Sequence, residues 1–140
     1  MAAPLQAVMR EMFTQMVEAK NISMVDTYYD REFILVTNGQ TQDYGAFHAG
    51  HARVYSTPIT YSVRYDDEAW VEESDRLAGR LWITTKRPDE AATDIEVMFV
   101  ATFRGGRIHR LWELTWPDWS SMKAFDNYDD RPPRAPSAGR

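Results

Sequence analysis

The 140-residue sequence contains no cysteine, which excludes disulfide bonds, a thiol nucleophile and a thiolate metal site. It also contains no apolar run that approaches the roughly 20 residues of a transmembrane helix. Basic residues are outnumbered by acidic ones: the sequence has 16 lysines and arginines and 21 acidic residues, and its formal net charge is −5. A nucleic-acid-binding surface needs an excess of basic side chains to neutralise phosphates. These absences argue against a membrane protein and against a nucleic-acid-binding protein.

The N-terminus lacks a basic segment followed by an apolar one, so the sequence shows no secretory signal and we expect a cytoplasmic protein. A chain of this length forms one domain. We place that domain at residues 1–120 and expect residues 121–140 to be a tail that is disordered toward its proline-rich end. Aromatic residues, in contrast, are abundant and make up 13% of the chain.

Three segments have the residue pattern of helices. Apolar residues recur at helical spacing over residues 5–17, and a shorter helix is predicted over residues 22–29. A third helix is predicted over residues 43–56, with the Asp43 side chain as its N-cap. Between the second and third helices, a β-branched apolar run ends in Asn38-Gly39, which is a strong signal for a hairpin turn.

After the third helix the hydrophobic period changes to two, which is typical of half-buried strands. The long strands are predicted at residues 59–65, 77–85, 95–103 and 108–116. Helices followed by hairpin-linked strands predict an α+β fold, in which helices cover one face of an antiparallel sheet. Because long strands twist and curl, we expect such a sheet to enclose a pocket.

Residues 103–113, FRGGRIHRLWE, place a glycine turn before a strand that carries Trp followed by a carboxylate. This pattern and the order of elements resemble the SnoaL-like proteins of the nuclear transport factor 2-like superfamily, over about residues 5–119. The resemblance implies a cone-shaped fold in which N-terminal helices pack on the concave face of a curved antiparallel sheet. It also implies homodimers through the outer face of the sheet, where Trp112 and Trp116 are expected to lie.

The groups that ketosteroid isomerase relatives use have no counterpart here. Phe13 stands where the resemblance places a tyrosine on the first helix, and Phe99 stands where it places a hydrogen-bonding aspartate. No carboxylate stands at the position of the base, near residues 36–38. Phenylalanine cannot donate a hydrogen bond to an enolate, so steroid-isomerase chemistry is not expected.

By resemblance, Glu113 matches the family's carboxylate and faces the cavity together with His109. A carboxylate in an aromatic pocket has its pKa raised by desolvation, which suits it to proton transfer near neutral pH. Alternatively, Glu113 pairs with Arg80 on a neighbouring strand and only stabilises the sheet. Glu96 is the other candidate partner of Arg80, and the sequence does not choose between them.

We predict that Glu113, His109 and His51 are catalytic. The predicted ligand-binding residues are mostly aromatic, and they are Phe13, Tyr28, Tyr29, Phe47, His48, Tyr55, Phe99, Leu111 and Thr115. The three histidines have a generic spacing without a metal signature, so we predict no metal site and no cofactor.

The predicted function is acid–base chemistry on a small apolar carbonyl compound, by an isomerase, a cyclase or a dehydratase. The alternative is a ligand-binding or dimerisation domain without catalysis. The two hypotheses differ in whether Glu113 and a histidine reach one ligand inside an open cavity. The expected partners are a small apolar molecule and a second copy of the chain.

Overall fold

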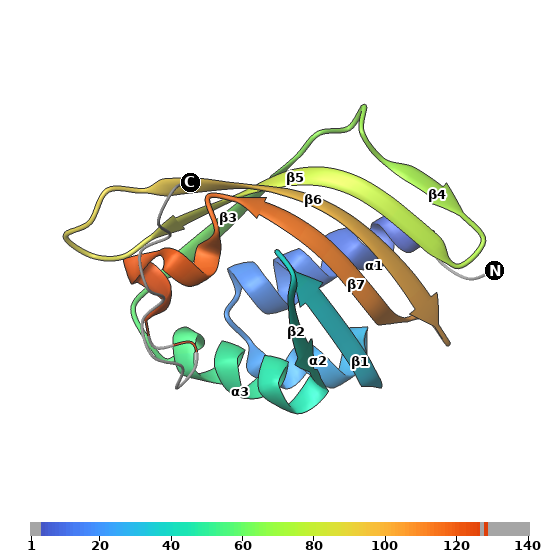
Figure 1. The fold of residues 1–140 in the computed structure, drawn as a ribbon, viewed down its shortest axis with the longest axis horizontal. Helices are drawn as coiled ribbons and strands as arrows, with labels where there is room; N and C mark the ends of the chain where they lie inside the picture. The colour runs from blue at the N-terminus through green and yellow to red at the C-terminus, as the bar shows by residue number, and fades with distance from the viewer. Residues whose placement is uncertain (1–3, 127, 129–140) are drawn as a thin grey trace.

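The computed structural model describes residues 4–126 and 128 of the chain. A long curved sheet lies over a layer of helices (Figure 1). The helical segments, in chain order, are α1 (Leu5–Met12), the π-helix η1 (Phe13–Glu18), the 3-10 helix η2 (Ile22–Met24), α2 (Val25–Tyr28), α3 (Tyr44–Tyr55), and the 3-10 helices η3 (Trp119–Ser121) and η4 (Lys123–Phe125). The strands are β1 (Tyr29–Thr37), β2 (Gln40–Asp43), β3 (Thr60–Tyr65), β4 (Val71–Glu73), β5 (Arg76–Lys86), β6 (Thr93–Arg104) and β7 (Arg107–Trp116).

The sheet has the strand order β2-β1-β7-β6-β5-β3, with β4 paired to β5. The α+β class and the helices on the concave face are confirmed (Figure 1). The prediction of an entirely antiparallel sheet is wrong, because β1 pairs with β7 in parallel. The hairpin formed by β1 and β2 therefore pairs with β7, which is the last strand in the sequence. Sequence periodicity reports which residues are buried but does not report strand direction, which explains the error.

Two tight turns form where the sequence predicts them. Asn38 and Gly39 have φ angles of +49° and +82°, and they connect β1 to β2. Gly105 and Gly106 have φ angles of +58° and +78°, and they connect β6 to β7. Both pairs adopt the left-handed conformation that a two-residue hairpin requires, and glycine adopts it without steric cost.

The helices bury the apolar stripes that the sequence predicts. Met9, Met12 and Met16 from α1 and η1 are almost completely buried against the sheet. The third helix begins as expected, since the Asp43 carboxylate accepts a hydrogen bond of 2.9 Å from the backbone N–H of Ala46. This bond satisfies one of the unpaired donors at the start of α3 and fixes the direction in which the helix leaves β2.

The packed part of the chain continues beyond residue 120. The Tyr128 ring lies 4.5 Å from the Trp119 ring and covers Gly50 of α3 so closely that a Cβ atom there would lie 2.5 Å from Tyr128 Cζ. The Arg53 guanidinium donates to the Tyr128 carbonyl oxygen over 3.3 Å. The predicted disorder of the tail toward its end concerns residues that lie outside the described ones.

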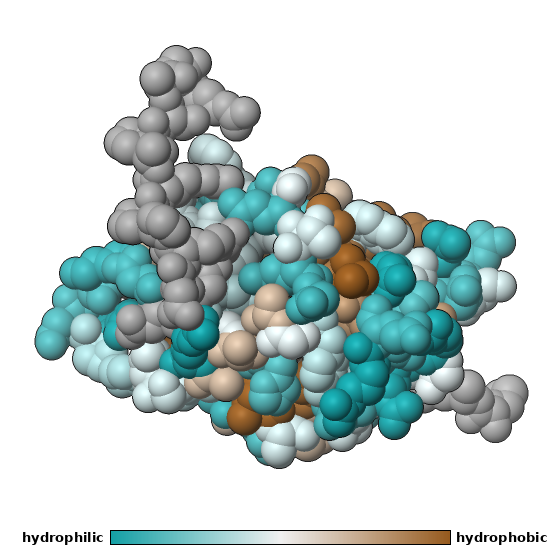
Figure 2. All heavy atoms as spheres, turned by 60° about the horizontal axis from the view of Figure 1, so that its bottom comes forward, coloured by the Kyte–Doolittle hydropathy of each residue, from teal (hydrophilic) through white to brown (hydrophobic). Residues whose placement is uncertain are grey.

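Hydrophilic side chains cover most of the side of the molecule on which α3 lies, with smaller hydrophobic areas between them (Figure 2). The outer face of the sheet differs, because β6 and β7 place exposed apolar side chains side by side there. This outer apolar patch consists of Met98, Val100, Trp112, Leu114 and Trp116. None of the helices in the described part of the chain combines the length and the hydropathy needed to span a membrane.

At one end of the concave face, Trp70 packs directly onto the backbone of β5. Its indole N–H donates to the Arg80 carbonyl oxygen over 3.0 Å, and its ring lies 5.2 Å from the Phe99 ring. Gly79 permits this approach, because a Cβ atom at that position would lie 2.7 Å from Trp70 Cδ2 and 3.0 Å from Phe99 Cε1. The contact closes this end of the core.

We expect Gly79→Ala to lower the free energy of unfolding by about 1–3 kcal/mol, because the added methyl group overpacks the contact with Trp70. Denaturant unfolding measures the effect. Gly45→Ala is the matched control, since the nearest atom to a Cβ atom there lies 3.6 Å away and alanine favours the helix. Equal stabilities of the two variants would contradict the close packing at Gly79.

Candidate functional site

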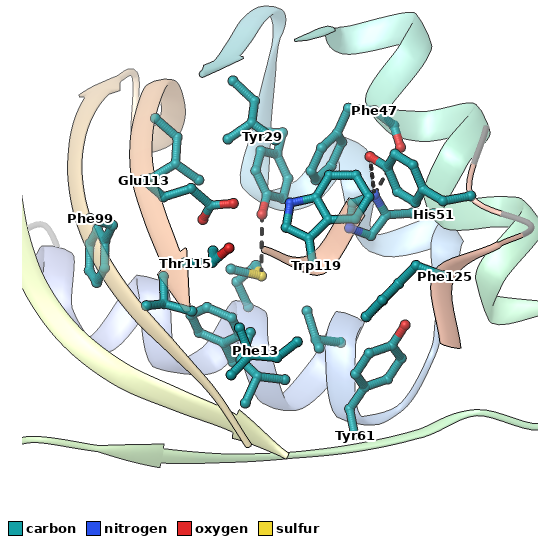
Figure 3. A pocket seen from close by; sticks show the side chains of 18 of the residues that line it. Phe13, Tyr29, Phe47, His51, Tyr61, Phe99, Glu113, Thr115, Trp119 and Phe125 are labelled. Atoms are coloured by element: carbon teal, nitrogen blue, oxygen red, sulfur yellow. Dashed lines mark hydrogen bonds between the residues drawn. The ribbon is translucent and has the colours of Figure 1, made fainter. Parts of the chain in front are cut away.

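A cavity of about 130 Å³ lies between the concave face of the sheet and the helices. Most of the side chains that line it are aliphatic or aromatic. The predicted site residues in the lining are Phe13, Tyr29, Phe47, His51, Tyr55, Phe99, Leu111, Glu113 and Thr115. The roles predicted for them remain predictions, but they come from distant parts of the sequence and the fold brings them together around one space (Figure 3).

The Glu113 carboxylate enters the cavity from β7. The parallel pairing of β1 with β7 places Thr37 directly opposite Glu113, and the Thr37 hydroxyl donates a 2.8 Å hydrogen bond to Glu113 Oε1. Among the described residues, no cation lies within ion-pair distance of Glu113. Burial raises the pKa of the Glu113 carboxyl, and the hydrogen bond from Thr37 opposes this only in part.

Arg80 does not pair with Glu113, although this pair was one of the two arrangements that the sequence allowed. The Arg80 guanidinium lies 2.9 Å from Asp66 Oδ2 and 2.5 Å from Glu96 Oε2. It also stacks on the ring of Trp82 at 4.5 Å. Arg80 is therefore satisfied on the outer face, and Glu113 does not stabilise the sheet through an ion pair with it.

His51 faces the same cavity from α3 in its neutral form. Its Nδ1 lies 2.9 Å from the Phe47 carbonyl oxygen, which only accepts hydrogen bonds, so Nδ1 carries the proton. Burial lowers the pKa of His51 to about 4. The neutral ring therefore keeps an unprotonated Nε2, which can accept a hydrogen bond or a proton from a ligand.

The Tyr29 hydroxyl points into the space between Glu113 and the helices (Figure 3). Its described acceptor is the Met12 sulfur at 3.5 Å, which is a weak hydrogen-bond acceptor. Burial and the nearby charge of Glu113 raise the pKa of Tyr29, so its hydroxyl stays protonated. Tyr29 therefore offers a hydrogen-bond donor at the Glu113 end of the cavity.

The prediction that His109 faces the cavity is wrong. In an unbroken strand it would share the face of Glu113, but the register shifts where Phe103 pairs with Ile108 and Thr102 pairs with Arg110. The extra residue forms a β-bulge, so Ile108 is buried and His109 turns away from the lining. A bulge of this kind leaves no clear mark in the alternation of apolar residues.

His109 lies instead beside Asp30 and Glu32, and the three residues together could offer ligand atoms to a metal. Arg104, however, already binds both carboxylates, at 2.8 Å and 2.9 Å. The cluster is therefore explained as an ion-pair network that ties the start of β1 to the end of β6.

Tyr28 and His48, predicted to bind the ligand, lie outside the cavity lining. The Tyr28 hydroxyl donates to Glu11 Oε1 over 2.7 Å, and the His48 ring stacks on Tyr44 with their centroids 6.0 Å apart. In α3 the inward stripe runs through Phe47, His51 and Tyr55 at intervals of four, and His48 is rotated about 100° from Phe47.

Sequence reasoning missed the contribution of the C-terminal segment. Trp119, Phe125 and Tyr128 line the cavity, and the Tyr128 hydroxyl donates to Gln42 Oε1 over 2.8 Å. An isolated aromatic residue after Pro117 gives no period from which burial could be inferred. The only available signal was the aromatic content of a segment otherwise typical of a tail.

No family model matches the chain, and no curated protein matches its sequence. Solved structures do match. A nuclear transport factor 2-like protein of unknown function from Exiguobacterium sp. 255-15 is 19% identical with a TM-score of 0.62, covering 79% of this chain and 98% of that one. The chain has the nuclear transport factor 2-like fold.

Other solved structures are similar to the chain to about the same extent. TsrD from Streptomyces laurentii is 16% identical over 80% of this chain and 87% of that one, with a TM-score of 0.64. A proposed isomerase from Rhodopseudomonas palustris is 10% identical over 83% of this chain and 92% of that one, with a TM-score of 0.68. The resemblance to SnoaL-like proteins is thus confirmed at the level of the fold.

We expect Glu113→Gln to change how stability depends on pH. A carboxyl whose pKa is raised in the folded state binds more protons there than in the unfolded chain, so stability falls as pH rises from about 4.3 to the raised value. The variant should lack this decrease, so its free energy of unfolding should rise relative to that of the wild type as pH increases. Denaturant unfolding between pH 4.5 and pH 8 measures the difference.

Glu73→Gln, at an exposed position in β4, is the control and should follow the wild-type profile. His51 acts with the opposite sign, because its lowered pKa makes stability fall as pH drops from about 6.5 toward 4. Both proteins contain His51, so the difference between their free energies of unfolding reports the ionisation of the Glu113 carboxyl alone. A constant difference across this pH range would contradict burial of Glu113.

Proposed function

We propose that this chain binds a small, largely apolar carbonyl compound in the cavity and transfers a proton on it, as isomerases, cyclases and dehydratases do. The observation that carries the proposal is the Glu113 carboxyl, which faces an apolar cavity with a single described hydrogen bond and no described counter-ion. A carboxylate kept only for structure is normally compensated by a cation or by several donors. An uncompensated one with a raised pKa is a typical acid–base group.

Glu113 and Tyr29 supply complementary parts of the proposed reaction. The ionised carboxylate accepts a proton from the carbon next to the ligand's carbonyl group, and the Tyr29 hydroxyl donates a hydrogen bond to the carbonyl oxygen as negative charge develops there. Glu113 then returns the proton to another carbon or to a leaving hydroxyl group. Tyr29 in this way provides the donor that Phe13 and Phe99 lack.

The cavity volume limits the size of the ligand. A protein cavity of about 150 Å³ holds one benzene molecule, and the cavity here is about 130 Å³. The preferred ligand is therefore the size of a single ring or a chain of similar volume. A polycyclic compound exceeds this volume and requires lining side chains to move.

The comparisons support the same class of function without specifying it. The matched structures include a proposed isomerase from Rhodopseudomonas palustris and a proposed polyketide cyclase from Acidithiobacillus ferrooxidans. A fold shared with such proteins is compatible with acid–base chemistry in the cavity, although one fold serves many functions. The alternative, a binding domain without catalysis, is favoured by the phenylalanines at positions 13 and 99.

Deuterium exchange at the carbon atoms next to the carbonyl of cyclohexanone tests the proposal. We expect the wild-type protein in D2O to accelerate the exchange, as followed by proton NMR. Glu113→Gln should reduce the catalysed rate by about 100-fold or more, because it removes the general base while preserving shape.

Tyr28→Phe is the control and should exchange the probe at the wild-type rate, since that hydroxyl bonds Glu11 outside the cavity. If cyclohexanone binds to the wild type without any acceleration of exchange, the catalytic proposal fails and the binding-domain alternative replaces it.

We also propose that two copies of the chain associate through the outer apolar patch. In this patch Val100 lies opposite Trp112 and Met98 lies opposite Leu114, so the apolar side chains are contiguous. Trp116 is 76% exposed and Leu114 is 68% exposed. Monomeric proteins rarely leave a contiguous apolar surface of this kind in water, and aromatic residues are enriched at interfaces.

We expect Trp112→Ala to raise the dissociation constant of this dimer by about tenfold or more, because a central aromatic side chain dominates such interfaces. Sedimentation velocity over a dilution series measures the constant. A monomeric wild type, or a variant that remains dimeric at the same concentrations, would refute the proposed interface.

A further inference from the structure

The chain that follows β7 forms one wall of the cavity. This C-terminal segment, which comprises residues 117–126 and 128, lies between one end of the sheet and α3 (Figure 1). Its aromatic residues Trp119, Phe125 and Tyr128 belong to the cavity lining. The proposed acid–base step uses none of them, so the segment has a role that this step does not explain.

The backbone of the C-terminal segment is not part of the sheet. In the part of the chain that the structure describes, its backbone hydrogen bonds close short turns within the segment, as from Met122 to Trp119 and from Tyr128 to Phe125. The other walls are held more firmly, because continuous ladders join β5, β6 and β7, and α1 buries Met9 in the main core. The segment can therefore move away without breaking a ladder.

Side chains make the described hydrogen bonds between the C-terminal segment and the rest of the molecule. The Arg53 and Arg87 guanidinium groups each donate over 3.3 Å, to the carbonyl oxygens of Tyr128 and Ala124. The shortest of these bonds is that of the Tyr128 hydroxyl, which donates to Gln42 Oε1 over 2.8 Å. Tyr128 is therefore the point at which the segment is attached most closely.

The Tyr128 ring packs against a bare stretch of α3. A Cβ atom at Gly50 would lie 2.5 Å from Tyr128 Cζ, so only glycine leaves room for the ring. Together with Val54 and Ile59, Tyr128 forms a small buried cluster that is separate from the main core. A small separate cluster opens at a lower free-energy cost than the main core of a domain.

We propose that the C-terminal segment is a lid that opens to admit the ligand, and that Tyr128 is the latch that closes it. Opening removes Trp119 and Phe125 from the wall of the cavity, while the sheet and α3 stay in place. A ring-sized ligand enters and leaves during these openings. The lid goes beyond the proposed function, because it controls access to the cavity whether or not Glu113 transfers a proton.

Gly50→Ala tests the latch, because the added methyl group takes the space of the Tyr128 ring and Gly50 itself is not part of the lining. The probe is fluorobenzene, a single apolar ring without a proton for Glu113 to remove. Fluorine NMR exchange measurements give its association and dissociation rates. We expect both rates to rise about tenfold or more, and the dissociation constant to stay within about threefold, because easier opening speeds entry and exit alike.

Gln42→Ala weakens the same latch in a different way, since it removes the acceptor of the Tyr128 hydroxyl. Both rates should rise about fivefold, which is the effect of one net hydrogen bond. The matched controls are Gly45→Ala on α3, where the nearest atom to a Cβ atom lies 3.6 Å away, and Thr41→Ala at an exposed position in β2. Both controls should keep the wild-type rates.

The proposal is overturned if folded Gly50→Ala and Gln42→Ala exchange fluorobenzene at the wild-type rates, or if fluorobenzene binds to none of the proteins. It is also overturned if the dissociation rate alone rises and binding weakens, because that result indicates a damaged cavity. Circular dichroism checks folding, and Gln42→Ala with its control decides alone if Gly50→Ala does not fold. Failure of the proposed function is distinguishable, since it abolishes the deuterium exchange of cyclohexanone and leaves the fluorobenzene rates unchanged.

Discussion

Hydrogen bonding between β1 and β7 joins the N-terminal hairpin to the long sheet, and this pairing decides what surrounds Glu113. The parallel register sets Thr37 opposite Glu113 and brings the turn residue Asn38 to the same strand. The Asn38 amide donates to Thr115 Oγ1 over 2.8 Å, and its carbonyl accepts from the Thr115 backbone N–H over 2.9 Å. The strand that carries the carboxyl is therefore fixed on both sides of Glu113, so its side chain enters the cavity in one orientation.

The pairing of β1 with β7 also completes the part of the sheet against which the aromatic core packs. Tyr29, Phe33 and Phe47 contact one another with ring centroids 4.8 to 5.0 Å apart, in edge-to-face and tilted arrangements. Such rings fill the space between β1 and α3 and exclude water from one side of the cavity. In this dry environment the charged forms of both Glu113 and His51 are disfavoured, so the pKa of the first rises and that of the second falls. The shifted pKa values of Glu113 and His51 are thus products of the packing.

Several elements of the fold and site could be predicted because they depend on local chemistry. The Asp43 cap, the two glycine turns and the apolar stripe of α1 follow from neighbouring residues, and each forms as predicted. The resemblance placed Glu113 on the cavity face, and Glu113 lies there because alternation along β7 is regular from Leu111 onward. His109 could not be placed correctly, because the β-bulge adds one residue to β7 and turns the His109 side chain away from the cavity. The prediction for His48 failed for a geometric reason, because His48 directly follows Phe47 and one residue of α-helix turns a side chain by about 100°.

By itself, the sequence determined which segments form helices and strands, where the chain turns and which face of each element is apolar. These properties arise from interactions between residues that are close in sequence, so their pattern can be read directly. Only the tertiary structure decided that β1 lies parallel to β7, that Arg80 pairs with Glu96 and Asp66, and that the C-terminal aromatics cover the cavity. Each of these depends on which distant surfaces meet, and several partners of equal chemistry were available. The cavity itself arises from that choice, because Glu113 of β7 and His51 of α3 lie far apart in the sequence and only the fold places both in its lining.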